Sequence, residues 1–510
     1  MNQFGFPLLS VVIFWPLVGG LLALVLGRSR RAARAWTLVV ALTDLALVLV
    51  LWAWFDYGQA GMQFVDRASW IPTLGIQYYV GLDGVSLWFL LLTAWLSVVA
   101  VLASWRLLER RPPEESRVYF FLLLALESGV LGVFTAVDLI LFYIFWEAML
   151  LPAYFLIGHW GGERRRYATL KFFLYTLAGS ALMLVAILVL AALHYRDTGL
   201  LTFNLWLLVH QPLPWAVQMG LLLAFGLAFA VKTPLWPLHG WLADAYVESP
   251  APVTILLAGV LSKMGIYGLL RFCLPLFPDA LAAARPWLWA LAVVGILYGS
   301  LVALAQTDLK RLIAFASLAH MNLLFAGALA ANLQGVQGAL LYSVSHGLTV
   351  TALFVLVDLL EARRGTRRLD DFGGLWKSVP RLGAVLLIVL FAAIGLPGLS
   401  GFPGEFTLLV GLARESVAVT ALVALGIILG AWYMLDLFRR AFAGPLTRAE
   451  NRTLPELRRR EALILLPLVV LMFVLGILPN LVVQPTTAAV NDLLTRAEAH
   501  RIVLVELREH

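Results

Sequence analysis

Long uninterrupted runs of apolar residues, separated by short polar loops, constrain this chain more than any other feature of its sequence. Each run is close to the roughly 20 residues that an α-helix needs to cross a bilayer. The 510 residues are 62% hydrophobic and 13% charged, whereas soluble domains carry about 25% charged residues. Strands of outer-membrane barrels alternate apolar and polar positions, and these runs do not. The sequence therefore predicts an all-α polytopic membrane protein and excludes a water-soluble globular enzyme.

Apolar runs and their glycine and proline breakers predict about 14 transmembrane helices. We expect them at residues 4–26, 35–55, 85–105, 118–134, 137–158, 170–194, 216–238, 253–273, 287–305, 309–330, 336–360, 382–412, 417–438 and 461–482. Helices 4–8 and 9–13 form two units of five crossings, and successive units with an odd number of crossings enter from opposite sides. The expected parts are helices 1–3 in 1–117, a first inverted repeat in 118–273, a second in 287–438, and helix 14 with the tail in 461–510.

The distribution of Lys and Arg sets the expected orientation of these helices. Loops that follow odd-numbered helices hold 27 basic residues, and loops that follow even-numbered helices hold 5. Cytoplasmic loops carry the excess of basic residues, so the odd loops are expected in the cytoplasm. Both termini are then expected on the periplasmic side. The net charge of +7 is therefore a topology signal and does not indicate a nucleic-acid surface.

Several ionisable side chains lie inside the predicted helices, where a charge costs about 2.5–3.5 kcal/mol to insert. Such residues usually face a bundle interior or a water path. A lone intramembrane histidine is more often structural, and Asp44, Asp138, Asp358 and Glu361 lie nearer the membrane interfaces, where structural roles are expected. Arg271, Lys310 and Asp436 are expected to reach the headgroups from helix ends. The candidate relay residues are Glu127, Glu147, Lys232, Lys263, His320, His346 and Glu405.

Two of the predicted helices contain breakers beside an ionisable residue. Helix 7 has Pro234 and Pro237 just after Lys232, and helix 12 has a Pro- and Gly-rich segment, 397–404, just before Glu405. Proline and glycine interrupt the helix and leave backbone N–H and C=O groups without helical hydrogen bonds. Such groups are tolerated at membrane depth only beside protein or water. Interrupted helices at matching places in two repeats are typical of a transport site. A kink that serves packing alone is the alternative.

A buried lysine paired with a carboxylate can act as a proton switch. A lysine in water holds its proton at neutral pH, and burial favours its release. A nearby carboxylate favours the ammonium again, so separating Glu147 from Lys232 would release a proton. Lys263 and the histidines would relay that proton, and Glu405 would deliver it to the outer side. Because an ammonium group cannot ligate Na⁺, a central lysine favours protons.

No cofactor or metal site is expected on this chain. A phosphate-binding loop, a CxxC pair and a dinucleotide fingerprint are all missing from the sequence. The single cysteine, Cys273, excludes a disulfide framework and a four-ligand iron–sulfur cluster. The energy for transport must therefore come from a partner or from another ion's gradient.

Four segments carry a resemblance to a known family. They are FWEAMLLPAYFLIGHWGG, AVKTPLWPLHGWLADAYVESPAPVTILLAGVLSKMGIYGLLRFCLPLFP, AQTDLKRLIAFASLAHMN and GLPGLSGFPGEF. They resemble the antiporter-like membrane subunits of respiratory complex I, and most closely the M-type subunits of bacterial proton-translocating NADH:quinone oxidoreductase. The resemblance extends over roughly residues 80–480. The loop PLHGWLADAY departs from the family's usual PFHxWLPDAH at Ala243 and Tyr246, so this chain has a tyrosine in place of the second histidine of that loop.

The resemblance implies 14 helices in two inverted repeats, with helices 7 and 12 broken. It places the family's channel residues at Glu147, Lys232, Lys263 and Glu405, and further matches at His320, His346 and Glu127. It implies that NADH oxidation by ubiquinone in partner subunits drives proton pumping here. Those partner subunits would hold NADH, ubiquinone, FMN and the iron–sulfur clusters. L-type and N-type antiporter-like subunits would be the neighbours of this chain. Its location would be the bacterial inner membrane.

Three other functions are compatible with the same residues. A D-type subunit of a multisubunit cation/proton antiporter would share the Lys and Glu pattern but would be driven by a gradient. A membrane subunit of a related membrane-bound hydrogenase is a second alternative. A scaffold without conduction is the third, and it leaves the paired Lys and Glu in broken helices unexplained.

Overall fold

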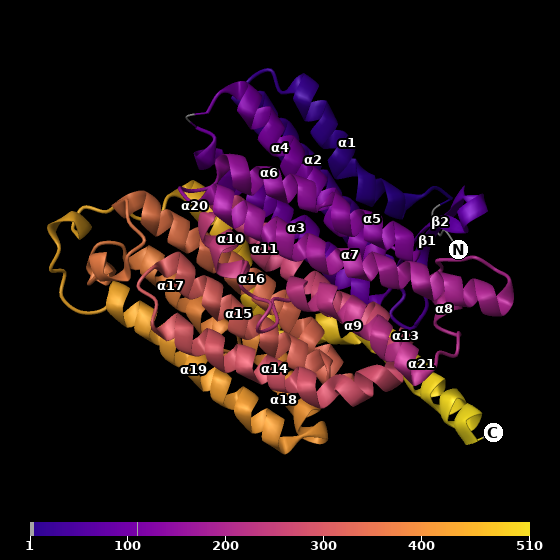
Figure 1. Ribbon diagram of the computed structural model, residues 1–510. Helices are drawn as coiled ribbons and strands as arrows, with labels where there is room; N and C mark the ends of the chain where they lie inside the picture. The colour runs from indigo at the N-terminus through magenta and orange to yellow at the C-terminus, as the bar shows by residue number, and fades with distance from the viewer. Residues whose placement is uncertain (1–4, 110, 510) are drawn as a thin grey trace.

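The computed structural model describes residues 5–109 and 111–509, with side chains up to residue 498, and it is a bundle of long helices (Figure 1). The membrane-spanning helices that precede the expected broken helix 7 are α1 (Leu8–Leu26), α2 (Arg30–Ala53), α3 (Gly84–Leu107), α4 (Pro113–Thr135), α5 (Leu139–Ala148) with α6 (Leu150–Trp160), and α7 (Arg165–Thr198). The uninterrupted spanning helices in the rest of the chain are α14 (Pro278–Leu304), α15 (Leu309–Ala328), α16 (Leu333–Arg364), α19 (Val417–Phe442) and α20 (Arg459–Ile477). The expectation of an all-α membrane fold is confirmed.

Thirteen of the described segments are long and apolar enough to cross a membrane. They match thirteen of the expected spans, and several extend beyond the expected bounds because charged residues continue the helices past the apolar core. The remaining expected span, 382–412, is two short helices, α17 (Pro380–Ala393) and α18 (Gly401–Glu415). Gly395 and Gly398 lie between them at φ +70° and +90°, which side chains other than glycine rarely adopt.

The expected break in helix 7 is also present. Helix α9 (Trp215–Lys232) ends at the predicted lysine, and the chain turns through Pro234 and Pro237 before α10 (Leu242–Glu248). Proline lacks the backbone N–H that would continue the hydrogen-bond ladder, so the helix stops there. Each of the two expected breaks therefore lies within a few residues of an ionisable side chain.

Helix 8 is broken as well, which the sequence interpretation did not anticipate. The expected helix 253–273 consists of α11 (Ala251–Gly259), a 3-10 turn (Leu261–Lys263), α12 (Met264–Gly268), a π-helical turn (Leu269–Cys273) and α13 (Leu274–Leu276). Neither Gly nor Pro marks this irregular stretch as clearly as in helices 7 and 12. Lys263 lies in the 3-10 turn, so the backbone around it departs from regular helix geometry.

Some elements lie outside the predicted spans. An antiparallel hairpin, β1 (Gln63–Ile71) and β2 (Ile76–Leu82), pairs Asp66 with Val80 and Arg67 with Tyr79. Helix α8 (Leu205–Leu208) is a single turn, and α21 (Asn480–Glu509) is a long C-terminal helix. Both ends of the described chain and the hairpin lie at one end of the bundle, and the segment 443–458 lies at the other (Figure 1).

Helices α11 and α16 form the buried centre of the bundle. Helix α16 packs against α3, α11, α15, α17, α18, α20 and α21. A side chain at Gly259 would meet Leu96 at 2.4 Å, and one at Gly347 would meet Leu92 at 2.7 Å and the Gly259 carbonyl oxygen at 3.1 Å. These glycines therefore allow α3, α11 and α16 to approach closely. The approach sets the 3-10 turn of helix 8 beside His346 of α16.

Candidate proton pathway

Lys263 is held at the broken part of helix 8. Its ammonium group donates to the carbonyl oxygen of Ala258 at 2.5 Å and to Nδ1 of His346 at 2.7 Å. The Ala258 carbonyl belongs to the last turn of α11, where carbonyl groups lack helical partners and attract a cation. Lys263 is fully buried. Because His346 accepts at Nδ1, a neutral His346 ring carries its hydrogen on Nε2.

His346 is followed by His320 of α15. The two imidazole rings stack with centroids 5.5 Å apart, and no hydrogen bond joins them among the described residues. A cavity of about 10 Å³, lined by both histidines and by Ser317 and Thr349, lies at this contact. That volume is close to the smallest that holds one water molecule. A proton passing between the two histidines therefore has no direct hydrogen bond to follow.

His320 contacts two tyrosine hydroxyl groups. Its Nδ1 is hydrogen-bonded to Tyr342 of α16, and its Nε2 lies 3.2 Å from the hydroxyl oxygen of Tyr433 of α19. Tyr342 lies four residues before His346, so both occupy the same face of α16. Tyr342 also interacts with Glu405, because the adjacent Gly404 packs directly against the Tyr342 backbone. Lys263, His346, His320, Tyr342 and Glu405 thus form one buried polar cluster.

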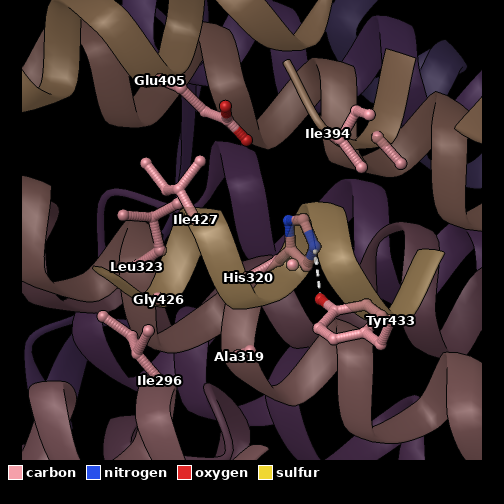
Figure 2. Close-up of a pocket in the computed structure, with 11 residues that line it drawn as sticks. Ile296, Ala319, His320, Leu323, Ile394, Glu405, Gly426, Ile427 and Tyr433 are labelled. Atoms are coloured by element: carbon pink, nitrogen blue, oxygen red, sulfur yellow. Dashed lines mark hydrogen bonds between the residues drawn. The ribbon is translucent and has the colours of Figure 1, made fainter. Parts of the chain in front are cut away.

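Glu405 occupies the space opened by the break in helix 12. A side chain at Gly395 would meet Oε2 of Glu405 at 2.1 Å, so the carboxyl group lies against the bare backbone of the break. A side chain at Gly404 would meet the Tyr342 backbone at 2.8 Å, so α18 and α16 are in close contact here. Figure 2 shows the Glu405 carboxyl group beside a cavity of about 20 Å³, with the hydrogen bond between His320 and Tyr433 on its other side.

Lys232 and Glu147 lie apart from that cluster. The Lys232 ammonium nitrogen has no hydrogen-bond partner in the described part of the chain, and it lies 5.3 Å from the Trp146 ring centroid and 5.7 Å from that of Phe172. Glu147 is half-buried on α5, within electrostatic reach of Lys232. No ion pair within 4.0 Å joins the two charged groups in the described residues. The expected pair is therefore neighbouring but separated, and no hydrogen bond among the described residues links it to Lys263.

Glu127 lies at a different place in the bundle from the other expected relay residues. It is buried in α4, and its carboxyl group faces that of Asp44 on α2 and the Ser97 hydroxyl on α3. Asp44 is fully buried inside the bundle beside Glu127. The sequence did not reveal this pairing because the two carboxyl groups come from helices more than 80 residues apart.

The expectation that Arg271 and Lys310 reach the headgroups was wrong. The Arg271 guanidinium is buried, and one nitrogen lies 2.6 Å from both carboxylate oxygens of Asp83. Lys310 is buried and donates to the carbonyl oxygens of Val247 at 3.1 Å and Ser249 at 2.6 Å, at the C-terminal end of α10. Tertiary partners, not headgroups, satisfy both cations. Asp436, by contrast, pairs with the exposed Arg439.

Tyr342 and Tyr433 are the residues of this cluster that sequence reasoning missed. Tyrosine is common in apolar helices, so neither residue attracts notice in the sequence. The spacing of Tyr342 and His346 was the available signal, because residues four apart share a helix face. In residues 5–109 and 111–498, no group of three or more His, Cys, Asp or Glu side chains is arranged as a metal site.

The fold and the buried polar cluster define a polytopic membrane protein with ionisable side chains along its interior. The NADH:quinone oxidoreductase/Mrp antiporter membrane family matches residues 136–430, and the amino-terminal family of NADH-ubiquinone oxidoreductase chain 4 matches residues 34–131. The chain belongs to the NADH:quinone oxidoreductase/Mrp antiporter membrane family.

Individual relatives agree with this assignment. Subunit M of NADH-quinone oxidoreductase from Rhodobacter capsulatus is 40% identical over 97% of this chain and 96% of its own length. A chain of respiratory complex I from Thermus thermophilus is 34% identical, with a TM-score of 0.85 over 95% of this chain and 99% of that one. A chain of the Mrp complex from Dietzia shares the fold, with 23% identity and a TM-score of 0.82 over 98% of this chain and 100% of that one.

Proposed function

We propose that this chain is the proton-translocating M-type membrane subunit of an NADH:quinone oxidoreductase. The buried cluster from Lys263 through His346 and His320 to Tyr342 and Glu405 carries this proposal, because each member can bind or pass a proton. Glu147 and Lys232 supply the proton, and Glu405 releases it at the outer side. The ammonium of Lys263 is bound by a carbonyl and an imidazole, a ligand set suited to a proton carrier and not to Na⁺.

The energy for this transport comes from partner subunits. NADH oxidation by ubiquinone takes place there, and FMN and the iron–sulfur clusters belong to those subunits. Moving one charge against a membrane potential costs about 2.3 kcal/mol per 100 mV, so a coupled downhill reaction is required. Glu147 is half-buried on the outer surface of this chain, which suits a position beside a neighbouring L-type or N-type subunit.

The proposed location is the bacterial inner membrane with both termini in the periplasm. The excess of basic residues in the odd loops supports this orientation, and both ends of the described chain lie at the same end of the bundle (Figure 1). Residues 118–273 and 287–438 are proposed to be two inverted repeats. The breaks after Lys232 and before Glu405 support matching positions in the two repeats.

Gradient-driven cation/proton antiport is the second candidate, because the Mrp chain shares the fold. Purifying the tagged chain from native membranes in mild detergent separates the two functions. Flavin and iron–sulfur subunits with NADH:quinone activity are expected to accompany it. Small hydrophobic partners without redox subunits would favour the antiporter.

Replacing Lys232 or Lys263 with alanine tests the proton pathway itself. We expect both substitutions in the assembled complex to lower proton pumping and coupled NADH oxidation together. Lys377→Ala is the matched control, because Lys377 is exposed in a short 3-10 turn (Leu375–Lys377) outside the spanning helices. Normal pumping by an assembled Lys263→Ala complex would refute proton translocation through this cluster, and with it the proposed function.

A further inference from the structure

The imidazole of His320 lies between two tyrosine hydroxyl groups, one at each ring nitrogen. Tyr342 meets Nδ1, and Tyr433 meets Nε2 at 3.2 Å. Both tyrosines are 1% exposed, so water from outside the bundle does not compete for these bonds. A neutral imidazole has one N–H and one bare nitrogen. One hydroxyl must therefore accept from the ring while the other donates to it.

Glu405 decides which hydroxyl donates, because Tyr342 faces Glu405 as well as His320. An ionised Glu405 only accepts, so the single Tyr342 hydrogen points to it and Tyr342 accepts from His320 Nδ1–H. The bare Nε2 then accepts from Tyr433. A protonated Glu405 donates to Tyr342 instead, the Tyr342 hydrogen points to Nδ1, and the ring hydrogen is on Nε2 toward Tyr433.

We propose that Tyr342 carries the proton between His320 and Glu405, and that Tyr433 is a positioning residue that fixes the His320 tautomer. This inference rests on the proposed proton-translocating function. It makes the position of the His320 ring hydrogen a direct readout of whether Glu405 is protonated.

The proton transfer balances along this chain of hydrogen bonds. One proton reaches His320 Nε2 from His346 through the cavity that both rings line, and the Tyr433 hydroxyl turns from donating to accepting at Nε2. The Nδ1 proton moves to the Tyr342 oxygen, and the original Tyr342 proton moves to Glu405. His320 and Tyr342 end neutral, and Glu405 ends protonated. After Glu405 releases its proton to the outer side, the Tyr342 hydrogen turns back to it. The ring hydrogen must then return to Nδ1 before a second proton can pass.

The surroundings of Glu405 restrict which other groups could do this. The ionisable side chains that face it are Tyr342 from α16, Tyr433 from α19 and His320 from α15. Lys263 and His346 lie one step further, on the other side of His320. The cavity of about 20 Å³ beside Glu405 (Figure 2) has room for one water molecule. That cavity offers a route between Glu405 and His320 that avoids Tyr342.

Infrared difference spectroscopy of the intact complex tests the coupling without using pumping as the readout. A pH step that protonates Glu405 should produce a carboxylic-acid band, assigned by its loss in Glu405→Gln. An imidazole band that reports the tautomer change, assigned by its loss in His320→Gln, should appear with it. Tyr342→Phe should keep the first band and lose the second, and Tyr433→Phe should shift the second. An unchanged imidazole band in Tyr342→Phe would overturn the proposal and assign the transfer to the cavity route.

Proton pumping in proteoliposomes provides the second test. Tyr342→Phe should slow proton translocation by about tenfold or more, since a positioned acid or base contributes roughly 10²–10⁴-fold to a proton transfer. Tyr119→Phe is the matched control, because Tyr119 is fully buried in α4 and its hydroxyl has no hydrogen-bond partner among the described residues. Normal pumping in Tyr342→Phe, with Lys263→Ala still inactive, refutes the Tyr342 link alone. Normal pumping in Lys263→Ala instead refutes the proposed function.

Discussion

Replacing Arg271 with methionine is expected to lower the free energy of unfolding by about 3–5 kcal/mol, the cost of leaving one member of a buried ion pair without its partner. Asp83 accepts from Arg271 at 2.6 Å through both oxygens, and both side chains are at most 6% exposed. Without the guanidinium, Asp83 keeps only the backbone N–H groups of Val85 and Ser86 at the start of α3. Those two bonds do not neutralise a buried carboxylate.

The double variant Asp83→Asn with Arg271→Met isolates the charge. Replacing a buried ion pair by neutral groups is often nearly neutral for stability, so the double variant should lose less than Arg271→Met alone. Arg439→Met is the exposed control, because that side chain is 72% exposed beside Asp436. An exposed pair contributes under about 1 kcal/mol.

The measurement is SDS titration of the purified chain in mixed micelles, followed by circular dichroism. If Arg271→Met loses no more stability than Arg439→Met, Arg271 is not held by a buried ion pair. A double variant no more stable than Arg271→Met would also refute the reasoning.

Four further outcomes are expected. Glu147→Ala should lower proton pumping by the assembled complex as Lys232→Ala does, and Glu147→Asp should be milder; a silent Glu147→Ala would remove Glu147 from the proton supply. Gly411→Ala should cost about 1–3 kcal/mol of unfolding free energy in the same SDS titration, because its side chain would meet the Gly335 nitrogen at 2.2 Å. Gly220→Ala, which meets nothing within 4 Å, should stabilise by about 0.4–1 kcal/mol. Reporter fusions should place loops 161–171 and 361–381 in the cytoplasm, and an outside position for both would overturn the topology.

Much of the fold follows from local features of the sequence. A bilayer requires each crossing to satisfy its backbone groups within a helix, so apolar runs of sufficient length identify the spans without tertiary information. Breaks in helices 7 and 12 follow from proline and glycine, which act on their own backbone. The irregular backbone at Lys263 was not predictable in this way. It contains a 3-10 turn and a π-helical turn in a segment without a strong breaker at the lysine.

The candidate site was only partly predictable from the sequence. The free-energy cost of inserting a charged side chain into a membrane is enough to single out ionisable residues in apolar helices. Lys263, His320, His346 and Glu405 were therefore identified before any contact was known. Tyr342 and Tyr433 were not, because a tyrosine in an apolar helix costs little and gives no comparable signal. Their role depends on three helices meeting at His320.

The sequence by itself determined that the chain crosses a membrane many times and which of its residues are costly to bury there. Tertiary structure decided which of those residues meet. Lys263 reaches His346 because Gly259 and Gly347 allow α11 and α16 to approach closely. Glu127 instead faces Asp44, and Arg271 reaches Asp83 instead of the headgroups. Insertion cost depends on one residue and its local flanks, whereas partnership depends on the packing of helices that are distant in the chain.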